Sequence, residues 1–517
     1  MCARERGWST VDEPVKRPSV NLLDRLGALT RRGGATRLKG LSDRQFTAVA
    51  AGLGLVLAAG AALAAGPWDS GQRKAEQAWA AARGGTGGVH HEAGTPSGAR
   101  PAPSAPPVLA PLSATGGAAD IADDSAPGAR TAPDGTASAP TAALGRLLKD
   151  PALGTARAAV VIDTATGKRL YEQGADTPMT PASTVKIATS AAALSALGPH
   201  HRIATTVRAS PDFRAVTLVG GGDPTLDKAA LRALAADTAR LLKQRGVTKV
   251  RLAYDTSRYS GPARHPIGRN ENIAPLTALM TDEGRLDRSD SGPAPRSDDP
   301  AGDTARAFGE LLDDAGIAVP SGPVPGRAPA DSRPVARHLS APLSALVERA
   351  LTNSDNDIAE ALARQTAVAA GEPADFDGSR RAVTARLGAL QLPLKGANLA
   401  DGSGLNRKDK VTAGLLAGLL ARAADPAHPE LRPVLTGLPV AGFTGTLSDR
   451  YTAKSAGTGL IRAKTGTLTG VNSLAGTVVD ARGRLLAFAF LASGTTSPSE
   501  AQSSLDALAT SLAAPAP

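Results

Sequence analysis

The sequence is poor in cysteine and in aromatic residues, and each shortage excludes a class of protein. Cys2 is the single cysteine among 517 residues, so neither an intrachain disulfide nor a cluster of thiolate metal ligands can form. Aromatic residues are only 3% of the chain, although the formal net charge is +10. Nucleic-acid surfaces usually combine clustered Lys and Arg with aromatic side chains. The composition therefore argues against a nucleic-acid partner.

The positive charge is also unevenly distributed. A basic head at residues 1–45 holds ten Lys or Arg and five acidic residues, which is half of the net charge. The other half is spread over the remaining 472 residues without a long basic run. This distribution suits a charged flank beside a membrane span better than a nucleic-acid surface.

The 21 residues from Phe46 to Gly66 carry no charge. About 20 apolar residues cross a bilayer as a helix, whereas a signal peptide has a shorter apolar core nearer the start. The segment therefore favours a single uncleaved transmembrane helix over a cleaved signal peptide. The excess of Lys and Arg before it places the N-terminus in the cytoplasm and the rest of the chain outside.

Residues 67–142 consist mostly of Ala, Gly, Pro, Ser and Thr. Such a linker cannot bury enough surface to offset the entropy of ordering it, which predicts a disordered tether. Sequence able to form a core runs from 143 to about 515. Strand patterns near both of its ends, at 156–176 and 474–493, predict a mixed α/β domain whose sheet pairs the first and last strands. The helices expected between and after them are 183–197, 226–245, 304–315, 343–352, 357–370, 379–390 and 498–512.

Ser183 and Lys186 are the first residues that could do chemistry. On a helix, residues three apart lie on one face, and Pro181 just ahead predicts a helix that starts at Ser183. A serine needs a base to take its proton, and a lysine can be that base only where burial or positive charge lowers its pKa. The ordinary interpretation is a helix-terminal serine beside a solvated lysine. However, this is the only Ser-x-x-Lys in the sequence.

Two more short motifs follow. Ser354-Asp355-Asn356 offers either an N-cap for the next helix or a proton-relay hydroxyl with a side-chain amide, and its Ser-x-Asn pattern recurs by chance at Ser19. Lys464-Thr465-Gly466 precedes a strand-like run, where an edge strand beside a glycine lets an extended peptide add its own hydrogen bonds. Lys464 would attract a substrate carboxylate and help to keep Lys186 neutral.

Together and in this order, these are the three motifs of penicillin-binding proteins and serine β-lactamases. From about Leu144 to Leu512 the chain resembles the D-alanyl-D-alanine carboxypeptidase/endopeptidase family, the class C low-molecular-mass penicillin-binding proteins (peptidase family S13). The segments that carry the resemblance are TPASTVKIATSAAAL, LVGGGDPTL, LTNSDNDIAEAL, ADGSGLNRKDKVTAGLL and GFTGTLSDRY…GTGLIRAKTGTLTGVNSLAG. The resemblance implies a β-lactamase/transpeptidase-like domain, with an antiparallel sheet flanked by helices, that acts on peptidoglycan stem peptides and is inhibited by β-lactams.

The resemblance also implies roles for the motif residues. Ser183 would attack the carbonyl of the penultimate D-alanine with Lys186 as general base, and Ser354 would relay a proton to the leaving amine. The implied catalytic residues are Ser183, Lys186, Ser354, Asn356 and Lys464, and the implied substrate contacts are Thr465, Gly466, Thr467, Gly404 and Arg407. Asn356 would bind the substrate amide. The backbone N–H groups of Ser183 and Thr467 would form the oxyanion hole, where one donor is typically worth roughly 10²–10³ in rate.

Gly404 and Arg407 lie in DGSGLNR and are plausible contacts for a diamino-acid side chain, although the glycine could equally serve a tight turn. The family often carries a large insertion between its first two motifs. Here Ser183 and Ser354 are 171 positions apart. We expect one smaller inserted domain at about 203–340, with the rest reduced to a polar loop around 287–303.

Two other functions remain open at this point. A serine β-lactamase or esterase could share the site, but no Glu-x-x-x-Asn lies between the second and third motifs to supply a deacylating base. A catalytically silent wall-binding protein would have had little reason to keep all three motifs. Cleavage of cross-links as a D,D-endopeptidase is a further activity of the family. No metal or cofactor site is expected, because the histidines are isolated and a lysine-based site leaves them no role.

Overall fold

The computed structural model describes residues 139–513. The predicted head at 1–45, the predicted span at 46–66 and most of the predicted linker at 67–142 lie outside the described residues. Within residues 139–513, none of the helices is long and apolar enough to cross a membrane. The first described helix, α4 (Ala139–Leu147), begins inside the last residues of the predicted linker.

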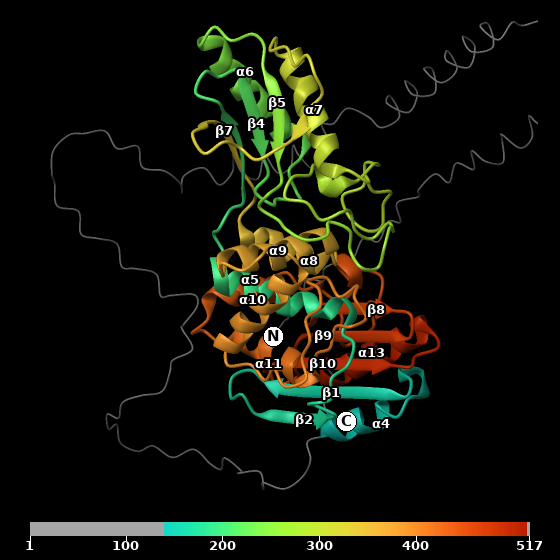
Figure 1. Ribbon diagram of the computed structural model, residues 1–517. Coiled ribbons are helices and arrows are strands. Elements are labelled where there is room, and N and C mark those ends of the chain that lie inside the picture. Colours follow the sequence, from blue (N-terminus) through green and yellow to red (C-terminus); the bar gives the residue numbers. More distant parts are fainter. Residues whose placement is uncertain (1–138, 514–517) are drawn as a thin grey trace, which may run out of the picture. The chain divides into compact units, whose positions relative to one another are not determined.

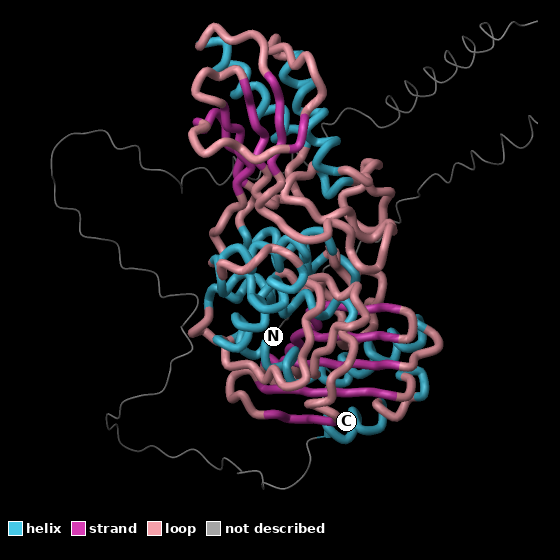
Figure 2. Tube along the Cα trace, in the orientation of Figure 1, coloured by secondary structure: helices cyan, strands magenta, loops and turns pink. Residues whose placement is uncertain are grey.

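A five-stranded antiparallel sheet has the order β2-β1-β10-β9-β8 (Figures 1 and 2). Its strands are β1 (Ala156–Asp163), β2 (Arg169–Gln173), β8 (Ile461–Leu468), β9 (Val471–Val479) and β10 (Leu485–Ser493). Ala156 of β1 pairs with Ser493 of β10, which confirms the expected pairing of the first and last strands. The sheet leaves β8, the strand with the Lys-Thr-Gly motif, at one edge.

Both faces of this sheet are buried, because alternate side chains of a strand point to opposite faces. Ala158 and Val160 of β1 join a core with one group of helices, whereas Ala159 and Val161 join a second core with α4 and α13 (Pro498–Ala513). The helices that contribute to the first core are α5 (Lys186–Leu197), α8 (Leu343–Thr352), α9 (Asn356–Ala369), α10 (Phe376–Ala389), α11 (Ala413–Ala424) and α12 (Arg432–Thr436). The expected helix-flanked sheet is therefore present.

A second five-stranded sheet is mixed and has the order β6-β5-β4-β3-β7 (Figure 2). Its elements are β3 (Ala204–Ala209), β4 (Ala215–Val219), α6 (Lys228–Gln244), β5 (Arg251–Asp255), α7 (Pro300–Asp314), β6 (Val324–Pro325) and β7 (Arg333–Leu339). A separate core joins the sheet to α6 and α7 through residues such as Leu218, Leu234 and Phe308. All of these residues fall within the predicted insertion at 203–340, whose status as a domain stays a prediction.

Several helix starts differ from expectation. The helix α10, for example, begins at Phe376 rather than at 379, after its cap Asp375. The helix α5 begins at Lys186 rather than at Ser183, because Ala182 has φ +49° and a 3-10 turn occupies Ala182–Val185. The helix α7 begins at Pro300 rather than at 304, since Asp299 accepts a hydrogen bond from Gly302 N and caps it. The helix α11 was not expected from the sequence, although its Thr412 cap is a common start signal.

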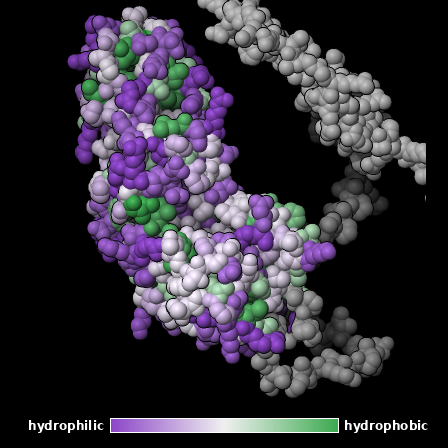
Figure 3. All heavy atoms as spheres, turned by 90° about the vertical axis from the view of Figure 1, so that its right-hand side faces the viewer, coloured by the Kyte–Doolittle hydropathy of each residue, from purple (hydrophilic) through white to green (hydrophobic). Residues whose placement is uncertain are grey.

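The surface of the described residues has no extended apolar area on the face shown in Figure 3, where green patches are small and separated. Large apolar side chains that are exposed include Leu286, Val324 and Phe443. Single exposed apolar residues are normal in a soluble domain.

Candidate active site

Ser183 and Lys186 lie on the turn that leads into α5. Lys186 is completely buried, and its Nζ donates to Ser183 Oγ at 3.0 Å. The same Nζ donates to Asn356 Oδ1 at 2.7 Å and to the backbone carbonyl of Ser403 at 2.6 Å. Ser183 itself is only partly buried. A partly buried serine thus contacts an amine that solvent cannot reach.

The second motif contributes through Asn356, the first residue of α9. Its Oδ1 accepts from Lys186, and its Nδ2 donates to the backbone carbonyl of Asn272 at 2.9 Å. Asp355 caps α9 by accepting from Ile358 N at 2.9 Å. The cap and the amide roles therefore occur together. Ser354 has φ +59°, which is uncommon for a serine, and its hydroxyl makes no hydrogen bond to another residue of the described chain.

The third motif lies on the edge strand β8. Lys464 is completely buried, and its Nζ donates to the carbonyl of Thr465 at 2.9 Å. The Thr465 hydroxyl donates to Thr446 Oγ1 at 2.9 Å, which fixes its rotamer. Thr467 is exposed. The strand therefore carries a fully buried lysine and, three residues on, an exposed threonine.

Gly466 lets β8 approach the turn that carries Ser183. A Cβ at this position would lie 2.6 Å from the Pro181 carbonyl and 2.2 Å from Ser473 Oγ, which no side chain tolerates. Ser473 Oγ and Thr184 Oγ1 both donate to that same carbonyl, at 2.6 and 2.8 Å. The turn is thereby tied to strands β8 and β9. The glycine serves a close backbone approach, and this explains why the motif requires it.

Gly404 and Arg407 occupy different environments. Gly404 is buried with φ +86°, and a Cβ there would lie 2.0 Å from the Ala182 carbonyl. Arg407 is exposed and donates to the carbonyl of Thr469, just beyond β8, at 2.9 Å. Gly404 thus supports the turn that carries Ser183, and a contact of either residue with substrate stays a prediction.

Burial lowers the pKa of both lysines. Desolvation lowers the pKa of Lys186 to about 8, although the charges of Asp401, Asp355 and Glu360 oppose this shift. Desolvation also lowers the pKa of Lys464 well below its usual value, and the positive charge of Lys186 adds to that effect. The charge of Lys186 thus lowers the pKa of Lys464, whereas the pKa of Lys186 falls through desolvation, and a contribution of Lys464 to the neutrality of Lys186 stays a prediction.

Several residues of the site carried no recognised signal in the sequence. The carbonyl of Ser403 holds Lys186, the hydroxyl of Ser473 holds the serine turn, and Thr446 orients Thr465. Ser403 lies in the DGSG segment and Thr446 in the GFTGTL segment, both of which belong to the family resemblance. Only their long-range contacts give them a role.

Two buried clusters bring together groups that can bind metals, namely His265, Glu360 and Asp401, and Glu283, Asp355 and Asp357. In the first cluster, the facing carboxylate oxygens already accept backbone N–H bonds from the turn at 402–406. In the second, Arg285, Arg296 and Arg349 provide the positive charge. These donor sets are already engaged with the protein, so they do not indicate a metal centre.

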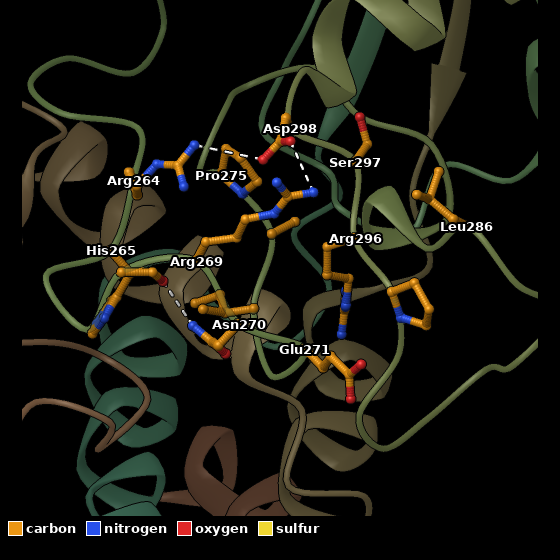
Figure 4. Close-up of a pocket in the computed structure, with 14 residues that line it drawn as sticks. Arg264, His265, Arg269, Asn270, Glu271, Pro275, Leu286, Arg296, Ser297 and Asp298 are labelled. Carbon is orange, nitrogen blue, oxygen red and sulfur yellow. Dashed lines mark hydrogen bonds and ion pairs between the residues drawn. The ribbon is translucent and has the colours of Figure 1, made fainter.

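A cavity of about 240 Å³ adjoins the site, shown in Figure 4. Arg264 and Arg269 both point to Asp298 across it, at 3.5 and 3.0 Å. Its wall includes the segments on either side of Asn272, whose carbonyl contacts Asn356. None of the three motifs lines the cavity, so it neighbours the serine site without being that site.

Comparison with known proteins shows the family to which the chain belongs. The profile of the D-Ala-D-Ala carboxypeptidase 3 (S13) family matches residues 141–291 and 283–514. A carboxypeptidase of Mycobacterium tuberculosis is 38% identical over 431 residues, which cover 80% of this chain and 89% of the relative. Carboxypeptidase DacB of Mycolicibacterium smegmatis is 38% identical over 402 residues, covering 73% and 85%.

A solved structure shares the fold. Penicillin-binding protein 4 of Haemophilus influenzae superposes with a TM-score of 0.60 at 23% identity, over 71% of this chain and 98% of that one. The penicillin-binding, β-lactamase-like α/β fold expected from the motifs is therefore confirmed. With a family profile that spans most of the described residues and relatives at 38% identity, the chain belongs to the D-Ala-D-Ala carboxypeptidase 3 (S13) family of hydrolases.

Proposed function

We propose that this carboxypeptidase cleaves the terminal D-alanine from peptidoglycan stem peptides through an acyl-enzyme on Ser183. The observation that carries the proposal is the 3.0 Å contact between the hydroxyl of the partly buried Ser183 and the buried Lys186 amine. A nucleophile within hydrogen-bond reach of a base is the geometry that covalent catalysis requires.

Lys186 acts as the general base in this proposal. With a pKa of about 8, roughly one tenth of the lysines are neutral at pH 7. The neutral amine accepts the Ser183 proton along the contact that exists in the resting state, while the Ser183 oxygen bonds to the carbonyl carbon. Asn356 and the Ser403 carbonyl hold the amine in place, since each accepts from Nζ. Ser354 passes a proton to the leaving D-alanine, and water then hydrolyses the ester.

Substrate binding uses the edge strand. The terminal carboxylate lies against Lys464 and Thr465, and the arriving negative charge raises the pKa of Lys464, so that the lysine becomes cationic when substrate is bound. The stem peptide extends along β8, with Asn356 contacting its amide. The N–H groups of Ser183 and Thr467 receive the oxyanion, because Gly466 lets the strand approach the serine turn.

β-Lactams acylate the same serine in this proposal. A structure of the Haemophilus influenzae protein contains a bound β-lactam. In the present chain, the second and third motifs enclose no Glu-x-x-x-Asn that could supply a deacylating base. We therefore infer long-lived acylation rather than the rapid turnover of a β-lactamase.

The enzyme works outside the cell in this proposal, held at the membrane by the span at Phe46–Gly66. The uncharged run, the basic flank before it and the Pro- and Ala-rich residues 67–142 support this placement. Fractionation of cells, with protease added to intact spheroplasts, tests it. Loss of the carboxypeptidase domain to the protease with retention of a small membrane fragment is the expected result, and full protection of the domain would contradict it.

Labelling with a fluorescent penicillin tests the activity. The wild-type chain should form a stable adduct and release D-alanine from a stem pentapeptide, and Ser183→Ala should do neither. Ser190→Ala is a control, because Ser190 is a buried serine of α5, the helix that follows Ser183, and has no motif role. Rapid loss of label would indicate a β-lactamase, and absence of both labelling and D-alanine release would indicate a silent binding protein.

A further inference from the structure

His265 is a buried histidine that the proposed mechanism does not use. It is 2% exposed, and its Nε2 lies 3.0 Å from Asp401 Oδ2 and 3.9 Å from Glu360 Oε1. Figure 4 shows its ring at the edge of the cavity, turned away from Arg264, Arg269 and Asp298. His265 thus belongs to the cavity wall, but its Nε2 faces two buried carboxylates.

The carboxylates beside His265 organise one tight turn. Asp401 Oδ1 accepts from Ser403 N at 3.0 Å and from Gly404 N at 2.6 Å, and its Oδ2 accepts from Asn406 N at 2.7 Å. Glu360 Oε1 accepts from Gly402 N and Ser403 N at 3.0 and 2.9 Å. The backbone amides of the DGSG turn are therefore held almost entirely by two side chains.

That turn is in direct contact with the catalytic helix. Its Ser403 carbonyl accepts from Lys186 Nζ at 2.6 Å, and its Gly402 carbonyl accepts from Thr189 Oγ1 at 2.8 Å. Gly404 packs against the Ala182 carbonyl so closely that a Cβ would overlap it. A shift of the turn would therefore move the acceptor that holds Lys186 and the backbone beside Ser183.

The tautomer of His265 follows from its second nitrogen. Nδ1 lies 3.3 Å from the backbone N–H of Ile267, which needs an acceptor there. Nδ1 thus carries the lone pair, and Nε2 carries the proton that is donated to Asp401. The edge of Phe376 packs against the ring with centroids 5.4 Å apart and holds its plane.

We infer that His265 is a positioning residue for Lys186: by donating to Asp401 it fixes the DGSG turn, whose Ser403 carbonyl holds the catalytic amine. The inference rests on the proposed role of Lys186. The segment between β5 and α7 would then help to position Lys186, because His265 lies in that segment. His265 contacts Asp401 across 136 positions of sequence.

The charged groups around His265 and Asp401 also affect the pKa of Lys186. Four charged or titratable groups face the His265–Asp401 pair. They are Lys186 on α5, Glu360 and Arg364 on α9, and Asp409 in the loop after the DGSG turn. Burial and the charge of Asp401 raise the pKa of Asp409 to about 10, so this acid stays protonated. Asp401 remains ionised, since hydrogen bonds from His265 and from the backbone lower its pKa against the effect of burial. Its negative charge favours the ammonium form of Lys186.

Loss of the His265 donor should therefore lower the pKa of Lys186. A displaced Ser403 carbonyl and a less ionised Asp401 both disfavour the ammonium form. Acylation should become slower because the amine is misplaced, by about 10- to 100-fold. In the pH profile of the acylation rate, the acid limb is the part where the rate rises as Lys186 loses its proton. This limb should move to lower pH by about one unit, because one hydrogen bond to a charged group is lost.

The test measures acylation of the full chain by a fluorescent penicillin between pH 6 and 9. His265→Gln keeps an amide N–H near the position of Nε2 and should label within about threefold of wild type with an unmoved acid limb, since its donor is retained. His265→Asn has the same amide on a shorter side chain that cannot reach Asp401, and should show both the loss and the shift. His338→Asn, a histidine of β7 outside the site, is the control and should label like wild type.

The pH profile separates positioning from stability. If His265→Asn has a lower melting temperature but labels at the wild-type rate with the same acid limb, the inference is overturned. The same holds if His265→Gln is as slow as His265→Asn, since the donor would then be irrelevant. A wild-type chain that does not label would instead overturn the proposed function.

Discussion

Two groups of buried charged residues in the molecule are built in opposite ways. Lys186 and Lys464 are fully buried, yet within the described residues neither has a carboxylate within 4 Å. The second group, Glu283, Asp355 and Asp357 with Arg285, Arg296 and Arg349, is a balanced set of ion pairs.

The difference has a physical meaning. Removing a charge from water without a partner shifts its pKa toward the neutral form, which a base needs. In the second group burial also raises the pKa of Glu283 to about 8 and that of Asp357 to about 7, and the charges of Arg349 and Arg296 oppose this shift. The arginines therefore fix the positions of these acids more than they keep them ionised. The paired group joins the segment at 283–296 to Asp355 and Asp357, the residues on either side of Asn356. The unpaired lysines therefore supply reactivity, and the paired cluster holds the second motif around them.

The largest effect should follow from removing the unpaired base. Lys186→Met keeps much of the side-chain volume but has no proton acceptor, so acylation should fall by roughly 10²–10⁴. The measurement is the second-order rate of labelling by a fluorescent penicillin. Lys395→Met, at an exposed lysine, is the control. Labelling within threefold of wild type would show that Lys186 is not the base.

The paired cluster should respond in stability. The Arg296 guanidinium lies 2.8 Å from Asp357 Oδ2, an ion pair whose angle falls short of a hydrogen bond, and both side chains are buried. Arg296→Met leaves Asp357 buried without its partner, which should cost about 3–5 kcal/mol in the free energy of unfolding. Urea denaturation measures it. A cost below 1 kcal/mol would mean that water or another side chain replaces the arginine.

The sequence predicted those features that depend on neighbouring residues. The contact of Lys186 with Ser183 agrees with the motif pattern, because a spacing of three residues is a local property. The contact of Lys186 with Asn356 spans 170 positions and did not follow from spacing. The antiparallel pairing of β1 with β10 also followed from strand patterns at the two ends of the domain.

Other features could not be predicted because they depend on long-range packing. The Ser403 carbonyl meets Lys186 across 217 positions, and Ser473 meets the Pro181 carbonyl across 292. A backbone carbonyl leaves no trace in composition or spacing. The helix start at Lys186 was missed for a similar reason, since the positive φ of Ala182 belongs to a non-glycine residue and is held by the strand packed against it.

A smaller effect concerns pH. Desolvation lowers the pKa of Lys186 to about 8, and the neutral form is the one that accepts the serine proton. The fraction of neutral lysine rises with pH, so acylation should increase about tenfold per unit below pH 8 and level off above it. Labelling rates measured from pH 6 to 9 test the sign. A rate that is flat or falls over pH 6–8 would exclude a base with this pKa.

The smallest effect should come from an exposed ion pair of the same chemistry. Arg306 pairs with Asp303 on α7, but both side chains are about half exposed, at 54% and 48%. Water solvates each charge when the other is removed, so Arg306→Met should change the free energy of unfolding by less than about 1 kcal/mol. The same urea titration compares it directly with Arg296→Met, since both variants replace one arginine of an arginine–aspartate pair by methionine. Equal losses in the two variants would mean that burial does not distinguish the pairs, and the contrast between the buried cluster and ordinary surface charge would no longer hold.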